Sequence, residues 1–177
     1  KKSIIPTTYN IHGLPLKVVD SAKYLGVTLQ KHISWNQHTD NICKKANSTR
    51  AFLQRNLHSC PPPVKAKCFT TFVRPTIEYA ACVWDPYSKR NISKLEMVQR
   101  KGARFVSGDW RRTSSVSEMM NQLGWEQLHV RRACVCLAML YNILNDRINI
   151  NHAFLHHLHP HIPPGEPSQS SLYHRAG

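Results

Sequence analysis

The stretch Asp20–Leu57 constrains the fold more than any other part of the chain. A short apolar run, Tyr24–Leu29, predicts a β-strand with Gly26 inside it, and a polar turn follows. Ser34 and Gln37 have the spacing of a capping box, in which each side chain bonds to the backbone amide of the other residue. An apolar stripe at helical spacing then contains Trp35, His38, Ile42, Ala46, Thr49, Leu53 and Leu57. The stretch therefore predicts a strand leading into one amphipathic helix over Trp35–Leu57, roughly 35 Å long.

The residues before this stretch predict a β-hairpin. Tyr9 and Ile11 alternate with polar residues, His12–Gly13 suits a tight turn, and the apolar residues Leu14, Leu16 and Val18 follow. Three short strands do not make a stable sheet by themselves. We therefore expect the hairpin and the strand to form the edge of a larger sheet.

The rest of the chain is predicted to be helical. We expect helices over Val64–Arg74, Thr76–Val83, Ile92–Val106, Val116–Leu123 and Glu126–Asp146, with a break or kink at Pro75, a cap at Asn91 and further caps at Thr113, Ser114 and Ser115. The predicted fold class is α+β and predominantly α-helical: a short N-terminal β-hairpin plus a strand in residues 1–33, then a bundle of about five to six helices in residues 34–150. Residues 151–177 are rich in His and Pro, and we expect a disordered tail there.

The composition points to an anionic partner. The 177 residues carry a formal net charge of +14, with nucleic acid as the leading partner and an anionic membrane surface as the second. We expect an intracellular protein, nuclear or cytoplasmic, because we find no transmembrane run and no signal peptide. The six cysteines form no CxxC pair, so small buried hydrophobes in a reducing compartment are expected, with a zinc site or disulfides as alternatives.

Basic residues are the main candidates for a functional site. On the predicted helix Ile92–Val106, cations occupy the side opposite Leu95, Ala103 and Val106. Candidate phosphate contacts are Lys44, Lys45, Arg50, Arg55, Lys94, Arg100, Lys101, Arg104, Arg111 and Arg112. An ordinary solvated surface is the alternative.

Each tryptophan and histidine singled out by the sequence is assigned either to ligand contact or to the core. Trp110, between Asp109 and Arg111, is a candidate for ligand contact, whereas Trp35 and Trp84 are expected in the core. His38 lies on the apolar stripe and is expected to be a core or interface histidine.

Catalytic and metal-binding patterns are missing from the sequence. No two of the ten carboxylates are adjacent, and there is no HExxH, no GxSxG and no Gly-rich phosphate loop. We therefore predict no catalytic residue and no metal ligand, and the histidines of the tail are interpreted as a flexible polar segment.

Seven segments, in order, resemble one family: IHGLPLKVVDSAKYLGVTL, SWNQHTDNICKKAN, FLQRNL, VRPTIEYAACVWDPY, KLEMVQRKGARFV, SSVSEMMNQLGW and RRACVCLAMLYNI. They are similar to the part that follows the catalytic YADD in reverse transcriptases of non-LTR retrotransposons, the LINE-type, jockey-like mobile elements. The resemblance implies an RNA-directed DNA polymerase fragment, with residues 1–33 ending the palm and residues 34–150 forming the thumb. Lys23, Tyr24, Leu25, Gly26 and Val27 then occupy the primer-grip position.

The resemblance also implies partners and a cofactor. The thumb would hold an RNA/DNA template–primer duplex, and the missing fingers, palm and endonuclease parts of the same polyprotein are possible partners; no membrane partner is expected. Mg²⁺ is implied for the full-length enzyme, with no cofactor in this chain, which alone is expected to be inactive because the YADD segment is absent. Two alternatives remain: a catalytically inert basic helical protein, binding nucleic acid or acting as a scaffold and derived from a retrotransposon, or a relic that folds poorly.

Overall fold

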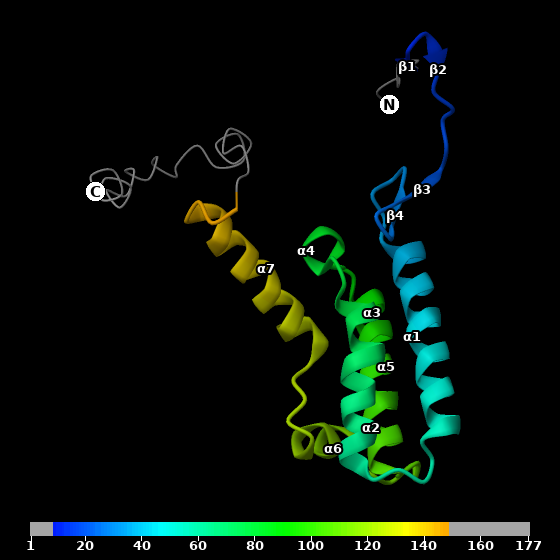
Figure 1. Ribbon diagram of the computed structural model, residues 1–177, viewed down its shortest axis with the longest axis vertical. Helices are drawn as coiled ribbons and strands as arrows, with labels where there is room; N and C mark the ends of the chain where they lie inside the picture. The colour runs from blue at the N-terminus through cyan, green and yellow to red at the C-terminus, as the bar shows by residue number, and fades with distance from the viewer. Residues whose placement is uncertain (1–8, 149–177) are drawn as a thin grey trace, which may run out of the picture. The chain divides into compact units, whose positions relative to one another are not determined.

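The computed structural model describes residues 9–148 (Figure 1). The chain divides into two compact units, Lys1–Ala138 and Met139–Gly177, and residues 139–148 are the described part of the second. The predicted disordered tail, residues 151–177, lies outside the described residues.

Within the described residues, two small antiparallel strand pairs precede a set of helices, which confirms an α+β, predominantly helical fold. The strands are β1 (Asn10–Ile11), β2 (Leu14–Pro15), β3 (Ser21–Tyr24) and β4 (Val27–Gln30). The helical elements are α1 (Asn36–Asn56), α2 (Pro62–Cys68), the π-helical segment η1 (Phe69–Val73), α3 (Arg74–Glu78), α4 (Ala81–Trp84), α5 (Lys89–Ser107), α6 (Val116–Gln122) and α7 (Leu128–Leu144).

The N-terminal hairpins confirm one strand prediction and correct another. β1 and β2 pair around His12–Gly13, as predicted. The predicted strand Tyr24–Leu29 is wrong, because the chain reverses direction inside it: Tyr24 pairs with Val27 across β3 and β4. Leu25 and Gly26 form the turn with φ angles of 44° and 85°, as in the primed turns that suit hairpins. Glycine is used here for its positive φ.

The predicted capping box at the start of α1 does not form. Trp35 is the N-cap residue and makes no side-chain capping bond. The Gln37 amide instead donates to Oε1 of Gln30 at 3.3 Å, and the Ser34 hydroxyl accepts from the Asn36 amide at 3.4 Å. The turn after β4 carries the Gln30 side chain to the helix start, so a strand residue supplies the cap.

Helix ends also differ from the predictions. α5 begins at Lys89, because the Ser88 hydroxyl accepts from the amide of Asn91 at 3.3 Å; Asn91 itself is buried and is not the cap. At the start of α6, Ser115 is the cap, as one of the three predicted residues. α7 begins at Leu128 rather than Glu126, where the Glu96 carboxylate accepts from two backbone amides of its first turn.

The helical run from α2 through η1 to α3 continues past Pro75 without the predicted break, and the chain is interrupted further on, at Ala80. Pro75 directly follows the wide turn η1, at whose end the Arg74 amide donates to the Phe69 carbonyl five residues back. The predicted helix Thr76–Val83 is interrupted at Ala80, whose φ of 53° is left-handed. Tyr79 therefore ends α3, and a separate single turn, α4, carries Trp84.

The core forms where α1, η1, α3 and α5 meet (Figure 1). His38 and Trp84 are fully enclosed, as predicted, while Trp35 is partly buried. A Cβ at Gly102 would overlap the ring of Phe69, so α5 packs against η1 at a point where no side chain fits.

The expectation that the cysteines are small buried hydrophobes holds only in part: Cys43 and Cys68 are partly buried and pack against the core. All six are free thiols, none is fully buried, and Cys82 and Cys134 are exposed. The short helix α4 buries only Ala81 and Trp84, and α7 buries only residues near its start, so the cysteines of both helices lie outside the core.

Acidification should destabilise the protein through His38. Its Nδ1 accepts a bond from the Thr28 amide at 3.1 Å, and burial lowers the pKa of the ring from its ordinary 6.5. The unfolded chain therefore binds this proton more readily, and the free energy of unfolding should fall as pH drops below about 6.5. Urea denaturation across this range measures the effect. His38→Asn keeps an acceptor near the Thr28 amide and should remove this part of the pH dependence; an unchanged dependence would contradict the assignment.

Candidate nucleic-acid interface

The long helices α1 and α5 carry a strong excess of positive charge. α1 has four Lys or Arg residues and one acid, Asp40; α5 has six and one acid, Glu96. Both acids are occupied: Asp40 forms an ion pair with Lys94, and Glu96 accepts from the backbone of α7. The remaining cations of the two helices therefore face no competing carboxylate from the same helices.

Two contacts set the alignment of α1 and α5, which lie side by side (Figure 1). The Asn91 amide donates to Oδ1 of Asn36 at 2.8 Å, and about one turn further along both helices Lys94 pairs with Asp40. The helices therefore run in the same direction. The ion pair is half-exposed and contributes at most about 1 kcal/mol, so its main consequence is to place charges.

The helical repeat places two more lysines along this line of contact. Lys44 follows Asp40 by one turn on α1, and Lys101 follows Lys94 by two turns on α5. Both are exposed. We call Lys44, Lys94 and Lys101 the α1–α5 basic seam: a row of three ammonium groups, one of which is paired.

A groove of about 740 Å³ lies beside α1, under the turn of the β3–β4 hairpin. Its lining brings together Lys23, Leu25 and Gly26 of the hairpin with Lys45 of α1. Of the residues assigned to the primer-grip position, these three line the groove, whereas Tyr24 is exposed and Val27 is buried in the core. The groove therefore presents two ammonium groups from different elements.

Tyr79 holds the hairpin turn in place and was not identified from the sequence. Its hydroxyl donates to the carbonyl of Leu25 at 3.1 Å, and its ring lies next to Gly26 in the groove wall. Its position depends on the left-handed conformation of Ala80, a non-glycine residue, and no sequence signal marks that conformation.

The other predicted cations of α1 and α5 differ in their accessibility. Arg55 and Arg100 are exposed, and Arg100 lines a second pocket of about 260 Å³. Arg50 is half-buried: its Nη1 donates to Oε1 of Gln54 at 2.6 Å, and burial lowers its pKa. Arg50 is therefore less accessible than Arg55 and Arg100.

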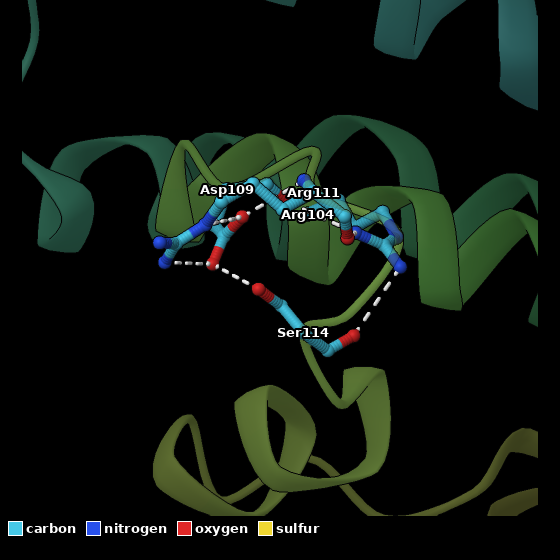
Figure 2. A network of polar contacts seen from close by, with 4 residues as sticks. All are labelled: Arg104, Asp109, Arg111 and Ser114. Carbon is cyan, nitrogen blue, oxygen red and sulfur yellow. Dashed lines mark hydrogen bonds and ion pairs between the residues drawn. The ribbon is translucent and has the colours of Figure 1, made fainter.

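Arg104, a predicted phosphate contact, bonds to the protein's own backbone (Figure 2). Its guanidinium donates to the carbonyls of Asp109 at 3.2 Å, Arg111 at 2.9 Å and Ser114 at 3.4 Å. Arg104 thus holds the loop that follows α5. Arg112 is exposed in this loop.

Asp109 completes this network (Figure 2). Its carboxylate accepts from the Arg111 amide at 2.9 Å, from the Arg111 guanidinium at 3.0 Å and from the Ser114 hydroxyl at 2.6 Å. These bonds hold the pKa of Asp109 well below its usual range and raise the pKa of Arg111. Arg111 is therefore partly neutralised by its neighbour.

The described carboxylates do not fit a Mg²⁺ site. Between residues 9 and 148, no three His, Cys, Asp or Glu side chains come together. Glu78 and Asp85 pair with Arg131 and Arg132 of α7, and Asp40, Glu96 and Asp109 have the partners described above. Two-metal catalysis needs carboxylates that converge, and the carboxylates of the described residues do not.

Within the described part of the chain, no helix has the length and apolar character needed to cross a membrane.

Comparison with known proteins gives one informative similarity. No protein-family model matches the chain, and no solved structure matches it. Among curated proteins, the chain is similar to the probable RNA-directed DNA polymerase from transposon X-element of Drosophila melanogaster, with 24% identity over 114 residues. The similar region covers 62% of this chain and 12% of the fly protein, so the chain spans a small part of that protein's length. This similarity supports a relationship to RNA-directed DNA polymerases of transposons.

Proposed function

We propose that this chain is the palm-edge and thumb part of a LINE-type, jockey-like retrotransposon reverse transcriptase, and that it holds the template–primer duplex by its phosphates. The similarity to a transposon polymerase supports the family, and the ordered sequence segments support the position within it. The chain contributes positioning, and the carboxylates for polymerisation belong to other parts of the enzyme.

The observation that carries the proposal is the uncompensated charge of α1 and α5. Lys44 and Lys101 line one seam, and Lys45 joins Lys23 across the groove beside it. The acids of both helices are already bonded within the protein, to Lys94 and to the backbone of α7, and these contacts offset their negative charge. Two adjacent helices with cations along their length suit a backbone that carries a charge about every 1.7 Å of duplex axis.

The exposed apolar hairpins support a partner for the N-terminal part of the chain. Large hydrophobic side chains of this part are exposed to solvent by half or more: Tyr9, Ile11, Leu14, Val18, Val19, Tyr24, Leu25 and Ile33. Two-stranded pairs with apolar side chains in water are marginally stable. We therefore propose that the rest of the palm covers them, an arrangement that favours a polymerase part over a free-standing scaffold protein.

A salt titration tests the duplex-binding role. The intact chain is titrated with a fluorescently labelled RNA/DNA template–primer at several salt concentrations. Release of counterions should make log K fall linearly with log salt, by about 0.9 for each phosphate contacted. Phosphate contacts by Lys44, Lys45 and Lys101 should therefore give a slope near about −3, and a further contact by Lys23 should make it steeper. A flat response, or no binding at about 50 mM salt, would contradict the proposal.

A further inference from the structure

The loop after α5, residues 108–115, is held rigidly by side chains of its own neighbourhood (Figure 2). Arg104 reaches from the last turn of α5 to three loop carbonyls, and Asp109 bonds both Arg111 and Ser114. Gly108 ends α5 with a φ of 68°, and Ser115 caps α6. Both ends of the loop and its middle are therefore fixed.

This rigid loop displays one aromatic ring to solvent. Trp110 is 48% exposed, whereas Trp84 and Trp125 are buried. From residue 98 to residue 129, a stretch that the structure describes throughout, Trp110 is the one large hydrophobic side chain exposed to solvent. A single exposed ring among polar and cationic residues is too small for a protein docking surface, which needs a contiguous apolar patch.

A ring of this kind matches a nucleobase. Every base has a flat π-face that stacks on an aromatic side chain, and neighbouring cations hold the adjoining phosphates. Trp110 is followed directly by Arg111 and Arg112, and Arg112 is exposed. Asp109, the acid within this loop, already bonds Arg111 and Ser114. Bases inside a duplex are stacked on one another, so the ring suits a base that has no pairing partner.

We propose that Trp110 stacks on an unpaired base of a single-stranded overhang that extends from the bound duplex, with Arg104 and Asp109 as positioning residues. This inference rests on the proposed duplex-binding role and adds a second, single-strand contact to it. The partner is single-stranded nucleic acid of any sequence, because stacking does not read the base edge.

The test compares two probes on the full chain: a blunt RNA/DNA duplex and the same duplex with a single-stranded template overhang. The overhang should raise the affinity of the native chain roughly tenfold to a hundredfold, the usual range for one stacked base. Trp110→Ala should remove this gain and leave affinity for the blunt duplex unchanged. Trp110→Phe should keep most of the gain.

The Asp109→Asn variant distinguishes the role of Asp109 in holding the loop from the effect of its negative charge on binding. The variant is more positive by one charge, so a purely electrostatic role predicts tighter binding of both probes. Loss of the fixed loop predicts instead a smaller gain from the overhang while Trp110 remains present. An overhang gain equal to that of the native chain, with both probes bound more tightly, would overturn the positioning role.

The outcomes distinguish this inference from the duplex-binding role. Salt-dependent binding of the blunt duplex with no gain from the overhang, or with a gain that survives Trp110→Ala, overturns the stacking inference alone. No salt-dependent binding of the blunt duplex contradicts the duplex-binding role, and with it the inference that rests on that role.

Discussion

Changing Lys44, Lys45 and Lys101 together to Gln should weaken binding of a template–primer duplex by at least about a hundredfold at 50 mM salt. Each lysine that contacts a phosphate releases a counterion, so the slope of log K on log salt should also become shallower by about 3. Glutamine keeps much of each side-chain stem, and all three positions are exposed, so folding should be retained. Fluorescence anisotropy over a range of salt concentrations gives both quantities.

The matched control removes the same charge elsewhere. Lys17, Lys31 and Lys67 are also exposed and lie outside the seam, and none of them lines the groove. Their joint change to Gln lowers the net charge by the same amount and should leave most of the affinity. Equal losses from the two triple variants would mean that overall charge alone drives binding, with no defined interface.

Trp84→Ala should destabilise the chain by about 3–5 kcal/mol, the usual cost of truncating a large core aromatic. Trp84 is fully buried, its ring contacts His38 with centroids 4.9 Å apart, and its Nε1 donates to the Tyr79 carbonyl at 2.7 Å. The change leaves a cavity and an unpaired carbonyl. Urea denaturation measures the lower transition midpoint at an unchanged slope.

Truncation of an exposed tryptophan provides the control for the stability measurement. Trp110 is exposed in the loop after α5, so Trp110→Ala should change the free energy of unfolding by no more than about 0.5 kcal/mol. A comparable loss at both positions would contradict the assignment of Trp84 to the core.

Periodicity in the sequence identified the helices, and turn chemistry identified the first hairpin. Of the predicted stripe, His38, Ala46 and Leu53 are buried, while Ile42 and Thr49 between them are partly buried. A 3.6-residue repeat of apolar side chains places them on one face of the helix, and that face packs against the core. The β3–β4 turn was missed because Leu25 takes a positive φ, which a leucine rarely does. The Gln30 cap was missed because the strand residue lies seven positions before the amide that it bonds.

The sequence indicates which cations lie on the helices, but not which of them already bond to other parts of the protein. Exposed cations such as Lys44 and Lys101 are found on the predicted helices. Lys94 and Arg104, however, have protein partners that the sequence pattern does not reveal: a carboxylate 54 residues away in one case and three loop carbonyls in the other. Whether a cation is free or already bonded depends on tertiary contacts, and a helical wheel contains no information about those.

The two hydrogen bonds of Tyr79 affect how the β3–β4 hairpin and the helical core unfold. Its hydroxyl holds the hairpin turn at Leu25, while its carbonyl accepts from Trp84 in the core. A second bond, from the Thr28 amide to His38, joins the same hairpin to the same cluster of rings. The hairpin that carries Lys23 is thus attached at two points to the most enclosed part of the chain. Fraying of the β3–β4 hairpin and opening of the helical core should therefore be coupled, so the groove between them is lost when the cooperative unit melts and not by local fluctuation of the hairpin.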